Sequence, residues 1–415
     1  MRLETKNVHG GRILDPETGA TQFPVHLSSA FAYPDSKKLA EVFAGTEYGH
    51  VYSRITNPTL TAFEQRLSSL EGGIGTVSFS TGMAAISGAL LGLLSHGDTL
   101  VASSSLFGGT WSLFQEFFPR MGIRVKLVDG IDLASVRAAV DNRTRALFVE
   151  SVSNPAIGVA DLEGWAAIAK EANAPLVVDN TCMPAHLSGK KLGIALLVYS
   201  TTKWIDGHGR AVGGAVTDTG AYKWRSAPHE HLAPWITKAG PMAFLAYLRN
   251  RILRDLGGTL SPHTAWIHSS GIDTLQLRFD RHCDNAQVLA QFLSTHPSVR
   301  SVLYTGMESS PFHERSKALF GGRNHGAVLS FTVSDQAAAW SVLDALKVAS
   351  RMTNLGDTRT LALHVWSTIN AAFSPEENAA MGVDPGLVRV SVGLENAQDL
   401  VDDFRQALDA IPATP

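Results

Sequence analysis

The residues best suited to chemistry in this 415-residue chain lie where apolar, strand-like segments end. One such segment ends in Asp179, and the next along the chain leads through Ser200 to Lys203. A lysine that directly follows a buried strand is partly desolvated, which lowers its pKa and makes its amine a nucleophile. A carboxylate at the end of a buried strand is costly unless it has a partner. Considered singly, Asp179 also fits a helix cap or an ion pair, and Lys203 also fits a side chain that reaches the surface.

A third strand end adds a candidate anion site. The first strand-like segment runs directly into Gly82 and Met83, where a helix is expected to begin. The free N–H groups at a helix N-terminus attract a phosphate, and glycine lets that phosphate approach the backbone. An amine, a carboxylate for a ring nitrogen and an anion cradle are together what pyridoxal 5′-phosphate requires. The three strand ends therefore predict a pyridoxal phosphate site, with the hydroxyls of Ser200 and Thr202 near the phosphate.

The elements that must position these residues alternate along the chain from residue 59 to about residue 215. The expected strands are Thr76–Ser80, Thr99–Ala102, Val125–Val128, Leu147–Ser151, Leu176–Asp179 and Leu197–Ser200. The expected helices between them include Thr59–Leu70, Met83–Leu94, Trp111–Arg120 and Leu162–Ala172. Strands this apolar are buried on both faces, which predicts an α/β fold with a mainly parallel sheet sandwiched by helices. Ligands of such sheets bind beyond the carboxyl ends of the strands, where the candidate groups lie.

We expect three parts: an N-terminal arm over residues 1–58, a cofactor-binding domain over 59–260 and a smaller C-terminal α/β domain over 261–415. The arm is rich in Gly, Pro and Asn and has weak periodicity, so it is expected to lie across the body or a neighbouring subunit. Residues 216–260 are less regular and end in an expected helix, Met242–Leu256. In the last part the clearest strands are Ala327–Val333 and Val388–Val392.

Composition excludes several classes of protein. The chain has 35 Lys and Arg against 38 Asp and Glu, a formal net charge of −3, and no basic stripe, so nucleic acid is not an expected partner. Only 18% of residues are charged, which suggests a surface covered by other subunits. The two cysteines, Cys182 and Cys283, exclude a disulfide framework and fit the reducing cytoplasm. No apolar segment approaches the length of a membrane span, and no signal peptide is expected.

Two rival enzyme classes fit less well. The glycines of Gly207–Gly213 do not form the G-x-G-x-x-G pattern of a nicotinamide dehydrogenase, and they follow Lys203 instead of opening a first βαβ unit. The run His229–His231 lacks the i, i+4 histidine pair of a zinc helix, so no metal site is expected.

Seven motifs, in order and over essentially the whole chain, resemble the Cys/Met-metabolism family of pyridoxal-phosphate enzymes. This family includes cystathionine γ-synthases, cystathionine γ-lyases, methionine γ-lyases and O-acylhomoserine sulfhydrylases. The motifs are Tyr52–Thr59, Ser80–Met83, Phe107–Thr110, Ser153–Pro155, Asp179–Thr181, Ser200–Lys203 and Arg389–Glu395. The resemblance implies the fold type I, aspartate aminotransferase-like architecture and a homotetramer built from dimers with shared active sites.

The resemblance also implies roles for the cofactor-binding residues. Lys203 would bond to the cofactor aldehyde and shuttle protons, and Asp179 would pair with the ring nitrogen. Phe107 would stack on the ring, and Asn154 would hydrogen-bond the 3′ oxygen. The phosphate would be held by Gly82, Met83, Ser200 and Thr202.

The implied substrate-binding residues come from two other regions. Arg389 would clamp the substrate α-carboxylate as a bidentate fork. Asn354 lies in a loop that is similar to the sulfhydrylase version. Tyr52 and Arg54 would reach the phosphate from the neighbouring subunit, and Tyr52 would also face the substrate.

Departures from the family pattern bear on the substrate. Phe107 stands where many members have a tyrosine; phenylalanine can stack but cannot donate a proton, which favours an acyl-ester leaving group over a thiolate. The run Ile205–Arg210 looks like that of enzymes that use succinyl esters, whereas the insertion ending in Arg254–Gly257 looks like that of acetylhomoserine sulfhydrylases. In residues 364–370, Trp366 and Asn370 suggest an altered substrate pocket or altered gating.

These observations predict γ-replacement on O-acetyl- or O-succinylhomoserine, with sulfide or a thiol, to give homocysteine or a methionine-type product. The alternative is a γ-lyase that releases 2-oxobutyrate and ammonia from methionine, homocysteine or another amino acid with a γ leaving group, such as canavanine. A non-enzymatic protein on the same fold is disfavoured because Lys203, Asp179 and Arg389 are all retained.

Overall fold

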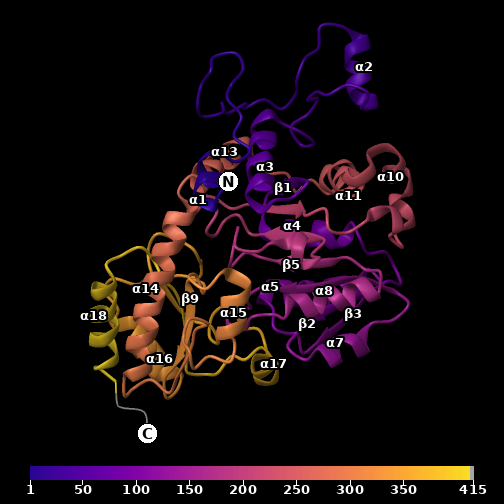
Figure 1. Cartoon of the computed structure of the whole chain (residues 1–415). Coiled ribbons are helices and arrows are strands. Elements are labelled where there is room, and N and C mark those ends of the chain that lie inside the picture. Colours follow the sequence, from indigo (N-terminus) through magenta and orange to yellow (C-terminus); the bar gives the residue numbers. More distant parts are fainter. Residues whose placement is uncertain (412–415) are drawn as a thin grey trace.

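Seven strands form the larger of two sheets in the computed structural model, which describes residues 1–411 (Figure 1). Across the sheet their order is β1 (Gly75–Phe79), β7 (Gly214–Asp218), β6 (Leu196–Tyr199), β5 (Leu176–Asp179), β4 (Thr144–Glu150), β2 (Thr99–Ser103) and β3 (Arg124–Val128). Strand β7 runs antiparallel to both of its neighbours, and all the other pairs are parallel. Each of the six expected strands overlaps an observed one. Strand β7 was not expected, because it extends into residues 216–260, whose sequence is less regular.

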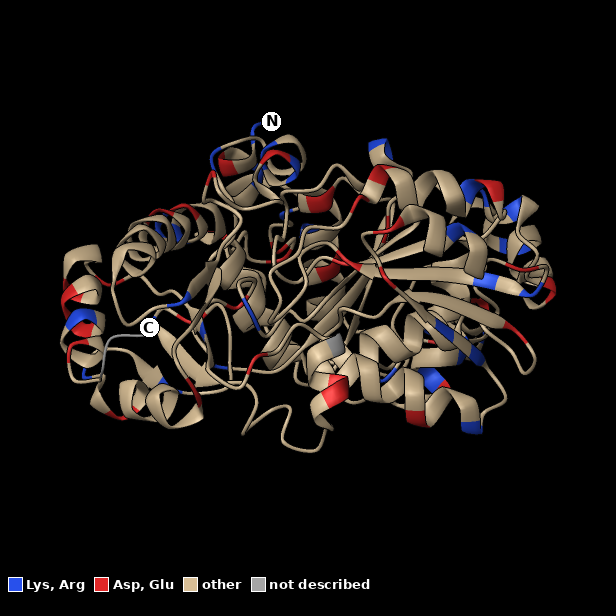
Figure 2. Ribbon diagram, turned by 90° about the horizontal axis from the view of Figure 1, so that it is seen from below, with Lys and Arg blue, Asp and Glu red and all other residues tan. Residues whose placement is uncertain are grey.

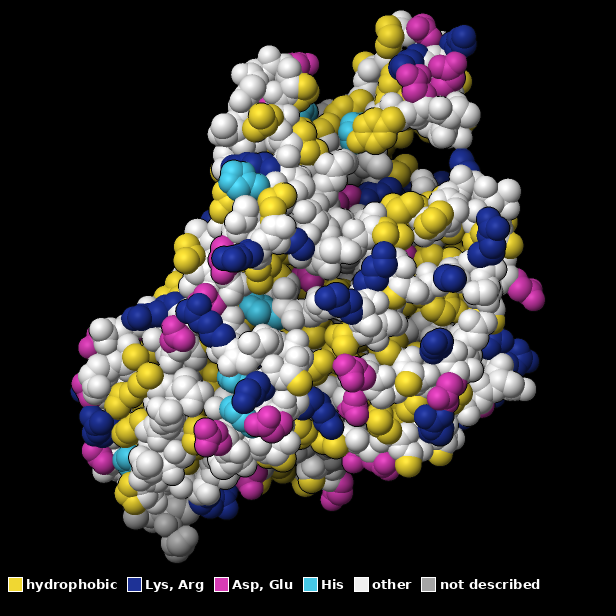
Figure 3. All heavy atoms as spheres, in the orientation of Figure 1, with side chains coloured by type: hydrophobic (Ala, Val, Ile, Leu, Met, Phe, Trp, Pro, Cys, Tyr) yellow, Lys and Arg dark blue, Asp and Glu magenta, His cyan; other side chains and the backbone are white. Residues whose placement is uncertain are grey.

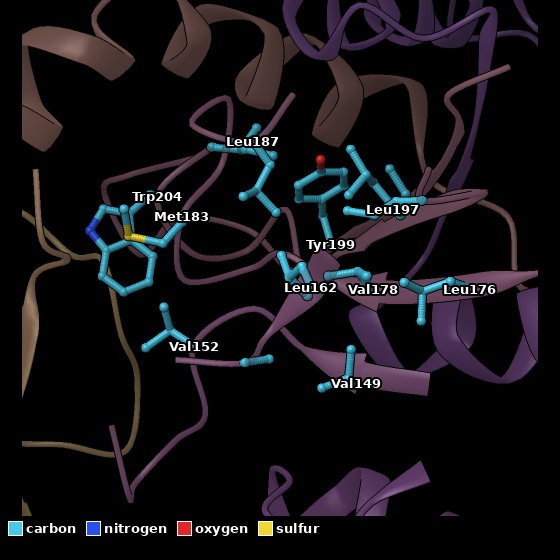
Figure 4. Close-up of a cluster of buried hydrophobic side chains, with 14 of the residues drawn as sticks. Val149, Val152, Leu162, Leu176, Val178, Met183, Leu187, Leu197, Tyr199 and Trp204 are labelled. Carbon is cyan, nitrogen blue, oxygen red and sulfur yellow. The ribbon is translucent and has the colours of Figure 1, made fainter. Parts of the chain in front are cut away.

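Helices cover both faces of this sheet because successive residues of its strands enter two different cores. Val178 and Leu197 pack on one face, and Val177 and Val198 on the other. The first core receives α3 (Pro58–Glu71), α8 (Leu162–Glu171) and α13 (Pro262–Ile272). The second receives α4 (Gly82–Leu91), α11 (Ala243–Tyr247) and the π-helical segment η5 (Leu248–Leu253). Figure 4 shows part of the first core, where Tyr199 is fully buried near Val178 and Leu197, and Trp204 is fully buried beside Met183.

The second, smaller sheet lies in the C-terminal part of the chain. Its order is β10 (Ser350–Arg351), β11 (Leu361–His364), β12 (Leu387–Ser391), β9 (Val328–Thr332) and β8 (Ser301–Leu303). The expected strands are β9 and β12, and the three short strands around them were not expected. Helices α14 (Leu275–Thr295), α16 (Gln336–Ala345) and α18 (Ala397–Leu408) bury their apolar faces against this sheet. The boundary at residue 260 stays a prediction.

Helix α14 belongs to both halves of the molecule. Its first turns place Leu275 and Phe279 in a core of the large sheet, and its later turns place Leu289 and Leu293 in the core of the small sheet. In Figure 1 this helix runs from beside α13 down to the small sheet. The two sheets are therefore joined by a continuous helix of 21 residues.

The first 58 residues contain two short helices, α1 (Leu3–His9) and α2 (Ser36–Ala44). Helix α1 is anchored on the body, since Arg66 donates a hydrogen bond to the carbonyl of Asn7. Helix α2 stands away from the body on a long loop (Figure 1), and the apolar side chains Leu27, Phe43 and Tyr48 on this projection are 76%, 70% and 76% exposed. Figure 3 shows apolar side chains gathered on the projection.

Charges of both signs are scattered over the outer elements in Figure 2, without a continuous basic stripe in that view. Across residues 1–411, no helix combines the length and the apolar character that a membrane crossing requires.

Candidate functional site

A cavity of about 480 Å³ opens at the carboxyl ends of β4, β5 and β6 and is closed on its other side by Arg389 and residues 353–355 from the small-sheet half. It brings together predicted residues that are far apart in the sequence. These are Gly82, Met83, Phe107, Asn154, Asp179, Ser200, Thr202, Lys203, Asn354 and Arg389. The predicted residues at the strand ends therefore lie around a single cavity, as expected for ligand binding beyond the ends of such strands.

Lys203 lies in the turn that follows β6, with its amine directed across the cavity. Its Nζ donates a hydrogen bond to Asn354 Oδ1 at 2.6 Å. Burial, and to a smaller extent the positive charge of Arg389, lowers the pKa of Lys203 to about 8. About a tenth of this amine is thus neutral and nucleophilic at pH 7, far more than for a lysine in water.

Two buried carboxyl groups face the same cavity. Asp179 ends β5 and Glu150 ends β4, and the two residues are direct partners in the parallel ladder. Burial raises the pKa of Asp179, and burial together with the charge of Asp179 raises the pKa of Glu150. The backbone N–H of Thr181 donates to Asp179 Oδ1 at 2.9 Å, and that of Phe107 donates to Glu150 Oε1 at 2.6 Å.

Glu150 is a site residue that the sequence analysis missed. The signal that identified Asp179, a carboxylate at the end of an apolar strand-like run, is also present at Glu150. Through its hydrogen bond to Phe107, Glu150 holds the loop that carries the aromatic ring on the cavity wall.

The N-terminus of α4 forms the expected anion cradle. Thr81 caps the helix by accepting a hydrogen bond from the N–H of Ala84, which leaves the N–H groups of Gly82 and Met83 at the cavity. A Cβ atom on Gly82 would lie 2.7 Å from Cβ of Ser200, so only glycine permits this close approach. The Thr202 hydroxyl is already engaged, since it exchanges hydrogen bonds with the backbone of Gly213.

Arg389 on β12 is 2% exposed, and burial lowers its pKa to about 10. It donates to Asn154 Oδ1 at 3.4 Å and to the Thr353 carbonyl at 3.1 Å, while its Nε has no partner in the described structure. No carboxylate of residues 1–411 forms an ion pair with it. Burying a cation without an anion is costly, so this arginine fits an anionic ligand.

Tyr52 and Arg54 lie outside the cavity of their own chain. The Arg54 guanidinium lies over the Tyr52 ring, 5.4 Å from its centroid, and also donates to the carbonyl of Arg254. Tyr52 is 44% exposed.

Trp366 and Asn370 do not line the cavity of this chain, so they do not alter its walls directly, and altered gating stays a prediction. Asn370 is buried and donates to Asn378 Oδ1 at 2.9 Å, and Trp366 packs on a small apolar cluster around Val365. The chain turns away from the cavity after β11 and supports the Phe107 loop from behind, where a Cβ on Gly108 would lie 3.2 Å from the ring of Phe373.

The geometry of these residues fits pyridoxal phosphate even without the family resemblance. The Gly82 cradle admits a phosphate, the amine of Lys203 is held partly neutral, and a carboxyl group is available for a ring nitrogen at Asp179. The unpaired Nε of Arg389 adds a place for the carboxylate of an amino-acid substrate.

Comparison with known proteins agrees with this geometry. Residues 4–409 match the family described as Cys/Met metabolism PLP-dependent enzyme. The chain is 40% identical to the sulfhydrylase FUB7 of Gibberella moniliformis (98% of this chain, 97% of the relative) and 38% identical to O-acetyl-L-homoserine sulfhydrylase 1 of Thermus thermophilus (98% and 100%).

A solved structure is similar along the whole chain. It is a putative O-acetylhomoserine (thiol)-lyase from Campylobacter jejuni, which contains N′-pyridoxyl-lysine-5′-monophosphate. Its TM-score is 0.94 at 32% identity, covering 99% of this chain and 100% of the other. This likeness confirms the expected fold type, and the chain belongs to the Cys/Met-metabolism family of PLP-dependent enzymes.

Proposed function

We propose that this protein catalyses γ-replacement on an O-acylhomoserine, in which sulfide or a thiol displaces the acyl group. The observation that carries this proposal is likeness over nearly the full length to sulfhydrylases, among them the Thermus thermophilus O-acetyl-L-homoserine sulfhydrylase. Phe107 supports it independently. The ring lines the cavity without a proton to give, and a carboxylate leaving group, being a weak base, needs no acid there.

When bound, pyridoxal phosphate supplies an electron sink for negative charge at the substrate Cα. Lys203 Nζ removes the Cα proton, and the hydrogen bond to Asn354 holds this amine in place before the reaction. Lys203 Nζ, once it has passed on the first proton, would take a proton from Cβ while the acyl group leaves Cγ as a carboxylate. After sulfide or a thiol adds at Cγ, Lys203 would return protons to Cβ and Cα. Arg389 would hold the α-carboxylate, and Asp179 would pair with the ring nitrogen.

A second copy of the chain completes the site in this proposal. The family pattern assigns Tyr52 and Arg54 to the cofactor phosphate, yet both lie outside the cavity of their own chain. The exposed apolar side chains of the projecting arm support a covered position in an assembly, and we propose a homotetramer built from such dimers. The two free cysteines support a location in the reducing cytoplasm.

A substrate panel tests the reaction. We expect the pyridoxal phosphate-loaded protein to form homocysteine from an acylhomoserine only when sulfide is present, as measured by chromatography of the products. Lys203→Ala should abolish turnover and the visible absorption band of the loaded protein. Release of 2-oxobutyrate from methionine, homocysteine or canavanine, with no gain from sulfide, would assign the protein to the γ-lyases instead.

A further inference from the structure

A completely buried histidine lies directly behind the turn that carries Lys203. His268 on α13 has no exposed surface and does not line the cavity. Its Nδ1 lies 3.0 Å from Oγ1 of Thr201, and its Nε2 lies 3.3 Å from the carbonyl oxygen of Ala211. The ring therefore bridges the start and the end of the loop that joins β6 to β7.

These two contacts fix the protonation of the His268 ring. A carbonyl oxygen can only accept a hydrogen bond, so Nε2 carries the proton, and a neutral Nδ1 accepts from the hydroxyl of Thr201. Burial lowers the pKa of His268; Asp206 partly offsets this effect and Arg210 adds to it, so the ring is neutral near neutral pH. The imidazole thus serves the loop as an acceptor at one end and a donor at the other.

The His268 ring is held in place by close packing. Phe63 of α3 meets it edge to face, with the ring centroids 6.0 Å apart. A Cβ atom on Gly213 would lie 2.6 Å from both His268 Cε1 and Thr201 Oγ1, so these two side chains fill the space beside this glycine. The backbone of Gly213 is in turn bonded to the Thr202 hydroxyl, on the cavity side of the same loop.

Thr201 differs from its neighbours in the direction it faces. Ser200, Thr202 and Lys203 line the cavity, whereas Thr201 is completely buried and does not. Across residues 1–411, the hydrogen bond that the structure gives its hydroxyl is the one to His268. The buried side of the turn is therefore anchored on a side chain from α13.

We propose that His268 is a positioning residue, which accepts the hydrogen bond of Thr201 and thereby turns Ser200, Thr202 and Lys203 toward the cofactor. Because His268 lies outside the cavity walls, it acts through Thr201. Without this acceptor a buried hydroxyl would lose its partner, which is unfavourable, and the turn would shift to satisfy it.

Binding of pyridoxal phosphate to the apoenzyme tests this role without any amino-acid substrate. His268→Leu removes both hydrogen bonds and Thr201→Val removes only the hydroxyl; we expect each to weaken cofactor affinity about 10-fold in an absorbance titration. His268→Asn keeps an acceptor near the position of Nδ1 and should restore most of the affinity. In the first two variants the pH of half-maximal loading should rise above about 8, because a displaced turn brings the Lys203 amine closer to water.

A double variant shows whether His268 acts through Thr201. If it does, combining His268→Leu with Thr201→Val weakens binding no further than His268→Leu alone, whereas additive losses would overturn the inference. Thr201→Val keeps the shape of the side chain, so it tests the same bond even if His268→Leu does not fold.

His229 provides a matched control. It is also a buried histidine, and its Nε2 is bonded to the carbonyl of Arg145 at the start of β4, the end of the sheet opposite to the cavity. His229→Leu should leave cofactor affinity and the pH of half-maximal loading unchanged. Wild-type affinity in Thr201→Val, or an equal loss in His229→Leu, would reduce His268 to a residue that only fills the core. Either result would leave the proposed reaction intact.

Discussion

At the scale of single residues, the site depends on charged groups held in an environment that disfavours their usual charge. Lys203 is half-buried near the cation Arg389, while Asp179 and Glu150 share one end of the sheet. Each group is costly to bury alone, and the cost is lowered when a bound ligand supplies the missing partner. The site is thus built for an occupant that carries both negative charge and a ring nitrogen.

The lowered pKa of Lys203 predicts how cofactor loading depends on pH. Only the neutral amine attacks an aldehyde, so the loading rate of the apoenzyme should rise with pH, reach half its maximum near pH 8 and level off about one unit higher, as followed by stopped-flow absorbance. Removing the nearby cation with Arg389→Gln should move the plateau to higher pH. Acetyl-lysine methylamide, whose side-chain amine is in water, should show no plateau below pH 10. A wild-type rate that still rises steeply above pH 9 would contradict the prediction.

Most residues of the candidate site can be predicted from the sequence, because each carries a local signal. Asp179, Lys203 and Gly82 are each found from one local signal, a functional group directly after a buried strand. Glu150 carries the same signal and could have been found. The position of Trp366 and Asn370 outside the cavity could not be predicted in this way, because the direction of the chain after β11 depends on packing around Val365, which no local pattern encodes.

At the scale of elements, the close approach of α4 to the end of β6 creates the anion cradle. The helix begins at Gly82 directly after β1, and the strand that leads to Ser200 lies two places away in the sheet. The cradle therefore depends on a sheet neighbour, β7, that separates β1 from β6.

Gly82→Ala tests this contact. The added Cβ would lie 2.7 Å from Cβ and 3.0 Å from Cα of Ser200, so the helix start must shift away from the strand. Overpacking of this kind costs about 1–3 kcal/mol, and we expect cofactor affinity to fall roughly 10- to 100-fold in an absorbance titration. Gly258→Ala is the matched control, because its Cβ would make only ordinary contacts, with Ala84 at 3.4 Å, Phe79 at 3.7 Å and Ser80 at 3.8 Å. Equal affinities in the two variants would show that the cradle tolerates the shift.

Strands are predicted correctly where they carry an apolar run that is buried on both faces. They are missed where the strand is very short or carries polar side chains. The six apolar runs of the large sheet are recognisable because helices cover both sides. Strand β7 carries Thr217 and Asp218, whose polar side chains weaken the apolar pattern, although both are fully buried here. The partner of Thr217, Thr76 Oγ1, comes from a distant segment, whereas the partner of Asp218, Trp224 Nε1, lies just after the strand. Strands β8, β10 and β11 are too short to show a period.

At the scale of the whole molecule, the N-terminal arm is the part that a single chain explains least well. It carries exposed apolar side chains, and it places Tyr52 and Arg54 outside the cavity that the family pattern assigns to them. Both observations are accounted for if the arm serves a second copy.

Mixing two inactive chains tests this arrangement. If Arg54 serves the neighbour, a dimer of one Arg54→Ala chain and one Lys203→Ala chain has one doubly altered site and one intact site. Random pairing should then restore about a quarter of the wild-type activity, whereas each variant alone stays far below it. If Arg54 serves its own chain, every site lacks one group and mixing restores nothing. Gel filtration of the mixture checks that the chains exchange.

The helix shared by both sheets has a mechanical consequence. Over its 21 residues α14 extends roughly 30 Å, and it is embedded at one end beside Lys203's strand and at the other beneath the strand that bears Arg389. Because the helix is continuous through both cores, it acts as a spacer between the half that bears Arg389 and the half that bears Lys203. It therefore helps to set the distance between the two groups to which we assign the substrate carboxylate and the proton transfers.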